Sequence, residues 1–301
     1  MSASKQIPEE AYERVRELIE TGLPLERAAM AVKDEFGLSQ EWSTVRRNFS
    51  SWRNLHNIPS YVPPLPEVLE MPFAGKVMAL ADCHVPYHCH GAVSEALDQA
   101  QSEDIKTLVL VGDVIDNDYC SQYMNMTAPG DAERVGEHIY LAYEFLEALT
   151  KVFKNIYVIK GNHDDRALKV VQRLWRMDHV WRIFTTTDKG SIFDRFTITD
   201  RFWMVMKDSP WGDYRFTHQK NYSVIRGRVA QRLVEKYRCN IVSSHCHDQV
   251  KSRVDDWWAV APGCIADPDK VEYIQMRDTL NPKWAVGWAT IDEAGVPHVH
   301  G

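Results

Sequence analysis

The 301-residue sequence lacks several features that would assign it to a particular class of protein. It has no apolar run near the roughly 20 residues that cross a bilayer, which argues against a membrane partner. Its six cysteines include no CxxC pair, and its first residues do not combine a basic start, an apolar stretch and a small-residue cleavage site. We therefore expect a reduced, cytoplasmic protein.

The sequence also lacks an excess of positive charge. It has 35 Lys and Arg against 42 Asp and Glu, a formal net charge of −7. Attraction to a polyanion such as DNA must therefore come from a local patch and not from the whole chain. Apolar residues make up 45%, which is typical of a globular protein and enough for a large core.

Residues 1–60 are predicted to form a small helical module. Apolar positions recur at helical spacing in three stretches, near 8–22, 25–37 and 40–54. A short turn with Gly37 separates the second stretch from the third, and Ser39 can cap the third helix. This order is typical of a helix-turn-helix.

The third helix of the module would present Arg46, Arg47 and Arg53, which suit contacts with phosphates and base edges. These three arginines on one helix predict contact with nucleic acid. Residues 1–70 hold 8 basic and 11 acidic side chains, so contact with another protein, or simple packing, is an equal alternative. Prolines concentrated between 59 and 72 predict an extended connector at 61–73, followed by a large domain at 74–301.

Three short apolar stretches of the large domain are predicted to be buried strands, and each ends in polar residues. They cover 76–81, 107–111 and 156–159, with helical patterns between them. Strands in such an alternating chain are parallel, so their C-terminal ends share one edge, where ligand sites collect. The residues delivered there are Asp82 and His84, then Asp113 and Asp116, then Asn162, His163 and Asp164.

The second half of the sequence supplies further imidazoles at the ends of predicted strands. His218 ends one strand, and His245 and His247 follow another. A basic helix is predicted between them, over residues 223–237. His245 and His247 are two residues apart, so in an extended segment they face the same side.

These five motifs, in this order and approximate spacing, resemble the calcineurin-like metallophosphoesterase family over residues 76–292, especially its phage and bacterial members. The resemblance implies an α/β fold of four layers, with two β-sheets flanked by helices. It implies one ion on Asp82, His84, Asp113 and His247, and a second on Asp113, Asn162, His218 and His245.

Two neighbouring divalent cations need a bridging anionic oxygen, which the Asp113 carboxylate can supply. The mixed His, Asp and Asn shells favour Mn, with Fe, Zn, Ni and Mg as alternatives. The expected reaction is attack on phosphorus by a metal-bridged hydroxide. His163 is the expected leaving-group acid, with Asp164 on its other ring nitrogen, and a third metal ligand or a structural turn residue is the alternative for His163.

Two departures from the family pattern bear on the substrate. Ser244 stands where a glycine usually precedes the last His-x-His, and Asn117-Asp118 replaces the Arg-Gly of the protein serine/threonine phosphatases. Protein phosphatase activity is therefore not expected. Arg166 and Asp116 are the candidates for substrate binding.

The sequence thus predicts a phosphodiesterase or nuclease acting on nucleic acid, with DNA favoured. A small-molecule phosphatase or cyclic-nucleotide phosphodiesterase is the first alternative. A DNA-binding regulator with a vestigial metal site is the second, and it ranks lowest because every expected ligand position is filled. The sequence does not indicate an oligomeric state.

Overall fold

The computed structural model describes residues 7–21, 23, 25–55, 67–121, 131–170, 175–270 and 284–301. The chain divides into two compact units, Met1–Leu65 and Pro66–Gly301, which we describe separately. Among the described residues, no helix is both long and apolar enough to cross a membrane.

The smaller unit contains the three helices expected from the sequence, α1 (Glu9–Glu20), α2 (Leu25–Glu35) and α3 (Trp42–Leu55). Their apolar faces meet in one core, because positions three and four apart lie on the same side of a helix. Phe49 is fully buried there, and its ring packs edge-on against Tyr12 at 5.0 Å between centroids.

The larger unit is built on two six-stranded sheets. The first sheet has the order β14 (Pro297–His300), β13 (Trp288–Ile291), β2 (Val77–Leu80), β3 (Thr107–Val111), β4 (Asn155–Ile159) and β7 (Phe196–Ile198). The second has the order β1 (Glu70–Pro72), β8 (Trp203–Lys207), β9 (Tyr214–His218), β10 (Asn240–Ser244), β12 (Trp257–Pro262) and β11 (Gln249–Val254). A two-stranded ribbon, β5 (Thr186–Thr187) with β6 (Gly190–Ser191), stands apart from both sheets.

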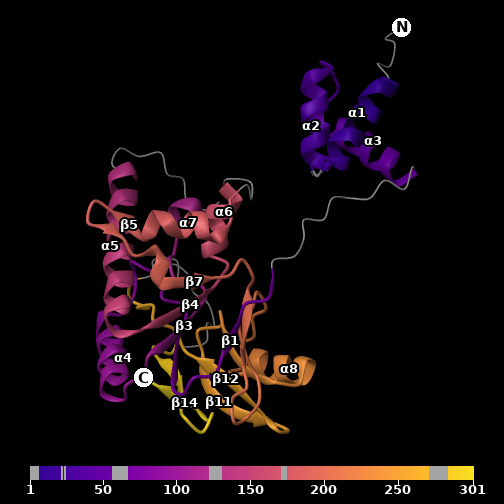
Figure 1. Ribbon diagram of the computed structural model, residues 1–301. Coiled ribbons are helices and arrows are strands. Elements are labelled where there is room, and N and C mark those ends of the chain that lie inside the picture. Colours follow the sequence, from indigo (N-terminus) through magenta and orange to yellow (C-terminus); the bar gives the residue numbers. More distant parts are fainter. Residues whose placement is uncertain are drawn as a thin grey trace. The chain divides into compact units, whose positions relative to one another are not determined.

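Helices cover the outer faces of both sheets, so the unit has four layers (Figure 1). On the first sheet lie α4 (His90–Ser102), α5 (Asp131–Val152) and α7 (Met177–Phe184), and on the second lies α8 (Arg228–Tyr237). The short α6 (Asp164–Val170) begins directly after the turn that follows β4. Two single-turn 3₁₀ helices, η1 (Asp118–Cys120) and η2 (Phe193–Arg195), complete the described elements.

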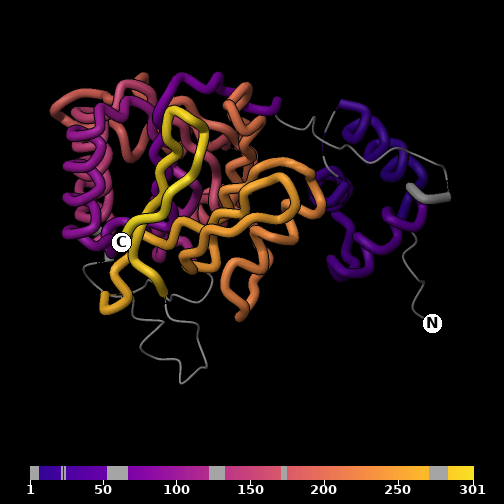
Figure 2. Tube along the Cα trace, turned by 90° about the horizontal axis from the view of Figure 1, so that it is seen from below, coloured from indigo at the N-terminus to yellow at the C-terminus, as the bar shows by residue number. Residues whose placement is uncertain are grey.

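The strand side chains alternate between two apolar cores. Leu108 and Leu110 of β3 pack against the helices, whereas Val109 and Val111 pack between the sheets. Every residue of β3 is buried, which explains why its residues 108–111 are continuously apolar and not alternating. The C-terminal hairpin β13–β14, yellow in Figure 2, extends the first sheet beside the orange strands of the second.

Two predicted boundaries differ from the structure. Residues 70–72, expected in the connector, form β1 and pair in parallel with β8, whereas residues 61–66 of the connector lie outside the described residues. The basic helix begins at Arg228 and not at 223, because Gly227 takes a left-handed conformation with φ of 69° and ends the preceding loop.

Candidate metal centre

The candidate centre lies where strands of both sheets end. β2, β3 and β4 run parallel in one sheet, and β9 and β10 run parallel in the other. Three overlapping groups of His and Asp atoms, each within 4.8 Å of one another, could hold metal ions: Asp82, His84 and His247; His84, Asp113 and His163; Asp113, His218 and His245. The structure thus brings aspartates and histidines from several strand ends close together, as the sequence predicted.

The backbone at this site adopts conformations that are uncommon for residues with a side chain. Asp82, His84, Asp113, His245 and His247 all have positive φ, between 48° and 89°. Such conformations cost free energy and persist where the surrounding structure enforces them, often at functional sites. They turn the side chains that follow the strands toward a common centre.

Two glycines allow the strand ends to approach one another. A Cβ on Gly161 would lie 2.1 Å from the backbone nitrogen of Asp113, and a Cβ on Gly112 would lie 2.6 Å from the His218 ring. Gly112 also has φ of 76°. These two positions therefore require glycine, both for space and, at Gly112, for backbone conformation.

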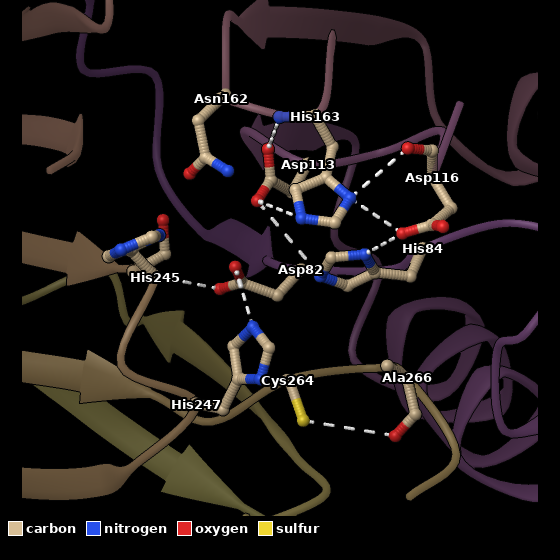
Figure 3. Close-up of polar contacts among 12 residues, drawn as sticks. Asp82, His84, Asp113, Asp116, Asn162, His163, His245, His247, Cys264 and Ala266 are labelled. Carbon is tan, nitrogen blue, oxygen red and sulfur yellow. Dashed lines mark hydrogen bonds and ion pairs between the residues drawn. The ribbon is translucent and has the colours of Figure 1, made fainter. Parts of the chain in front are cut away.

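Asp113 occupies the middle of the site (Figure 3). Its Oδ2 lies 3.2 Å from Nε2 of His218 and 4.0 Å from Nε2 of both His84 and His163. Its Oδ1 accepts a hydrogen bond from the backbone N–H of His163 at 2.6 Å. Burial raises the pKa of Asp113, but the facing His218 and His163 outweigh burial and hold it well below its usual value.

Asp82 joins the two sheets through the His245-x-His247 motif. Its Oδ2 accepts the backbone N–H of His245 at 3.0 Å, and its Oδ1 lies 3.1 Å from Nε2 of His247. Burial raises the pKa of Asp82, but His247 and His218 outweigh burial and lower it. The carboxylate is therefore available as an anionic ligand.

His84 provides a direct test of whether the site fits a cation. Its Nδ1 donates to Oδ1 of Asp116 at 2.6 Å, which fixes the tautomer and leaves a lone pair on Nε2. That Nε2 is buried and has no hydrogen-bond partner among the described residues. Burial and the neighbouring His163 lower the pKa of His84. A neutral imidazole with an unpaired, inward-facing nitrogen is what a metal ion requires.

The expected second ligand set also comes together. Nε2 of His218 lies 3.0 Å from Oδ1 of Asn162, and the His218 ring lies 5.2 Å from that of His245. Burial lowers the pKa of His218, but Asp113 outweighs burial and raises it to about 9. Ser244 contributes here, since its hydroxyl donates to the Val111 carbonyl at 2.6 Å and lies 2.9 Å from Nδ1 of His218.

The carboxylate beside His163 is Asp116 and not Asp164. Nδ1 of His163 lies 2.6 Å from Oδ1 of Asp116, and its Nε2 accepts from Arg166 at 3.0 Å. Asp164 instead accepts the backbone N–H of Gly161 at 2.8 Å through Oδ2, while its Oδ1 faces the N–H of Ile115 at 3.4 Å. The expected Asp164–His163 pair is therefore wrong, because Asp164 begins α6 and folds back over its own turn.

Two residues make contacts at the site that were not predicted from the sequence. Asp116 was expected to face substrate, yet it orients both His84 and His163, and its spacing three residues after Asp113 was the available signal. The Trp284 ring lies edge-on 3.9 Å from the His247 ring, between centroids. No motif surrounds Trp284, so only the tertiary structure reveals it.

The candidate nucleic-acid contacts belong to the smaller unit. Arg46 and Arg47 are exposed on α3, where Arg46 forms an ion pair with Glu26 at 2.8 Å. Arg53 lies in α3, and its side chain is outside the described residues.

A two-sheet sandwich whose strand ends gather buried aspartates and histidines defines a metal-dependent phosphoesterase. The sequence model of the calcineurin-like phosphoesterases matches residues 75–285, and the chain belongs to this family. Divalent metal ions are the cofactors of the family, and the His and Asp groups of this chain could hold them.

Several solved structures are similar to the chain at low sequence identity. Vacuolar protein sorting 29 from Cryptosporidium parvum is 13% identical, with 72% of this chain and 84% of that chain covered and a TM-score of 0.39. YfcE, a phosphoesterase from E. coli, is 16% identical, with coverages of 72% and 88% and a TM-score of 0.37. An archaeal phosphodiesterase is 14% identical, with coverages of 74% and 97% and a TM-score of 0.39. No curated protein matches the chain, so the family match carries the assignment.

Proposed function

We propose that this chain is a phosphodiesterase with two divalent cations, Mn favoured, that cleaves nucleic acid, DNA favoured. The observation that carries the proposal is the pair of ligand groups that share Asp113, one with His84 and His163 and one with His218 and His245. A shared carboxylate is the arrangement that two adjacent cations need.

The ligand roles are those that the family resemblance implies, and the grouping of the His and Asp atoms supports them. One cation would be held by Asp82, His84, Asp113 and His247, and the other by Asp113, Asn162, His218 and His245. When bound, the cations would supply Lewis acidity and positive charge for attack of water on a phosphate ester.

His163 would protonate the leaving group. Asp113 and Asp116 together outweigh burial and raise the pKa of His163, while the charge of Arg166 opposes them. In the structure the Arg166 guanidinium donates to Nε2 of His163. A substrate phosphate would attract this guanidinium, and Nε2 would then be free to hold the proton that the leaving oxygen takes up. Arg166 thus has the substrate-binding role, and Asp116 holds His163 in place.

The remaining assignments concern the whole chain. The module at 1–60 is helix-turn-helix-like and would bring nucleic acid to the domain at 74–301 through Arg46, Arg47 and Arg53, with 61–73 as the connector. All six cysteines are free, which supports a cytoplasmic location. A small-molecule phosphatase or cyclic-nucleotide phosphodiesterase is the alternative that uses the same centre, whereas complete ligand sets speak against a vestigial site.

A panel of substrates tests the proposal. The metal-free protein is loaded with Mn²⁺ and given a chromogenic phosphodiester, a chromogenic phosphomonoester, single-stranded DNA and duplex DNA. We expect Mn²⁺-dependent cleavage of the diester and of DNA, abolished by a chelator and restored by metal. Hydrolysis of the monoester alone would favour the phosphatase, and metal-independent DNA binding without hydrolysis would favour the regulator.

A further inference from the structure

A groove lies beside the candidate centre, along the exposed side of α8. Its volume is about 830 Å³. It is lined by residues of the loop 219–225 and of α8: Gln219, Lys220, Asn221, Tyr222, Ser223, Ile225, Arg228, Val229, Gln231, Arg232, Leu233 and Lys236. We call it the α8 groove.

The lining of the α8 groove begins one residue after a candidate ligand. Gln219, its first residue, directly follows His218 at the end of β9. The carbonyl of Asn221 accepts a hydrogen bond from Sγ of Cys246 at 3.7 Å, and Cys246 stands between His245 and His247. The backbone N–H of Gly227 donates to Asp248, which follows the same motif, at 2.5 Å. Two contacts therefore tie the groove loop to the chain that carries the candidate ligands.

The charge of the groove has one sign. Lys220, Arg228, Arg232 and Lys236 line it, and no carboxylate among the described residues does, although the chain as a whole carries −7. Arg228, Arg232 and Lys236 are four residues apart, so they form one row along α8, about 6 Å between neighbours. Like charges at this spacing repel one another and destabilise a helix, and a bound polyanion would reverse this effect. The spacing is close to that of successive phosphates along an extended strand.

The groove also exposes an aromatic ring. Tyr222 is 52% exposed and Ile225 is 63% exposed. Aromatic rings in basic grooves stack with unpaired bases, whereas a duplex keeps its bases stacked inside and offers mainly phosphates. The combination of a cation row and an accessible ring therefore fits a single strand.

We propose that the α8 groove binds a single strand of nucleic acid, with its phosphates along Arg228, Arg232 and Lys236 and a base on Tyr222. The inference rests on the proposed function, since it places the strand that leads into the same centre. It deepens that function by making the preferred substrate a single-stranded polymer and not a small ester or an intact duplex.

The test compares the full-length protein with its Arg232→Ala/Lys236→Ala variant, both loaded with Mn²⁺. The substrates are an oligothymidylate of about 20 nucleotides, its duplex with oligodeoxyadenylate, and a chromogenic phosphodiester. We expect the ratio of kcat/KM for the oligothymidylate to that for the chromogenic diester to fall at least about tenfold. The dependence of log Kd on log salt should become shallower by about 1.4, because two phosphate contacts with a single strand are lost.

Lys106→Ala/Lys154→Ala is the matched control. These two exposed lysines lie where β3 and β4 begin, at the end of the sheet opposite the candidate centre. The control removes the same charge and should leave the ratio and the salt dependence unchanged. Tyr222→Ala should weaken oligothymidylate binding, and Tyr222→Phe should restore it, because stacking needs the ring and not the hydroxyl.

The outcomes separate the groove from the enzyme. If the groove variant and the control change the ratio of kcat/KM values equally, the proposal that the α8 groove binds the strand is rejected. If the groove variant loses as much kcat/KM on the duplex as on the oligothymidylate, the preference for a single strand is rejected. Absence of metal-dependent hydrolysis of every substrate by the unmodified protein would overturn the proposed function. In that case fluorescence anisotropy of a labelled oligothymidylate still tests whether the α8 groove binds a single strand. Unchanged affinity in the groove variant would reject that binding.

Discussion

Asp116 serves two histidines at once. Its Oδ1 lies 2.6 Å from Nδ1 of His84 and of His163, so one carboxylate orients a candidate ligand and the candidate acid. Burial raises the pKa of Asp116, but hydrogen bonds from both rings outweigh burial and lower it. An ionised Asp116 keeps both Nε2 atoms directed toward Asp113.

The role of His163 can be tested by removing its imidazole. His163→Ala should lower kcat on a chromogenic phosphodiester by about 10²-fold or more, because the leaving group loses its acid. Bound metal, measured by elemental analysis after gel filtration, should stay at the level of the unmodified protein. Full activity would reject the acid role, and lost metal would instead make His163 a ligand, as its place beside His84 and Asp113 allows.

Asp164 is expected to act on stability and not on chemistry. Asp164→Ala leaves the buried backbone N–H of Gly161 without its acceptor. It also removes the carboxylate oxygen that faces the backbone N–H of Ile115. The free energy of unfolding should therefore fall by about 1–3 kcal/mol. Urea unfolding measures this change. Unaltered stability together with lost turnover and normal metal content would return Asp164 to the catalytic residues.

At the scale of the elements, the turns after the strands decide the geometry of the centre. Gly112 ends β3, and its missing side chain is what allows the His218 ring of β9 to reach Asp113. The absence of a Cβ in this turn therefore lets the two sheets approach each other at the centre.

Gly112→Ala should impair metal binding. The new methyl group would lie 2.6 Å from the His218 ring, and alanine is strained at φ of 76°. We expect weaker Mn²⁺ affinity by isothermal titration calorimetry and a lower urea midpoint. Gly136→Ala is the control, since open space surrounds that position in α5 and alanine should stabilise the helix by about 1 kcal/mol. Equal Mn²⁺ affinity in both variants would contradict this account.

At the scale of the whole molecule, the chain holds two units with separate cores. The core of α1, α2 and α3 contains only residues of the smaller unit, whereas the larger unit has its own cores on both faces of its sheets. Each unit therefore has the apolar interior that independent folding requires.

Phe49→Ala tests this independence. Truncation of a fully buried phenylalanine costs about 3–5 kcal/mol, comparable to the stability of so small a unit. The helical unit should unfold, seen as faster proteolysis within 1–65, while hydrolysis of a chromogenic phosphodiester stays unchanged. Phe36→Ala, at a side chain 36% exposed, is the matched control. Loss of small-substrate hydrolysis in the Phe49 variant alone would show that the units depend on each other.

The same variant addresses nucleic-acid contact by the smaller unit. If Arg46 and Arg47 hold DNA, unfolding of α3 should lower the affinity for DNA and leave the chromogenic reaction intact. Equal DNA affinity in the Phe49 and Phe36 variants would instead favour a protein partner or simple packing.

Much of the fold could be predicted because the determining signals are local. The buried strand β3 follows from apolar spacing with the predicted bounds 107–111, and α4 and α5 lie where helical patterns were predicted between the strands. The start of α8 could not be predicted as well, because the apolar spacing continues through a loop that only the conformation of Gly227 separates from the helix.

The sequence by itself determined that Asp, His and Asn follow the predicted strands. Because a parallel sheet places the carboxyl ends of its strands at one edge, the sequence also predicted that these residues share a site. From the strand ends it grouped Asp82, His84, Asp113 and Asn162, and the family resemblance implied that His218, His245 and His247 join them. Only the tertiary structure decided which side chains touch: Asp116 and not Asp164 beside His163, Trp284 against His247, and Ser244 beside His218. Those contacts join residues from different turns, and their geometry depends on backbone angles and packing that no local pattern encodes.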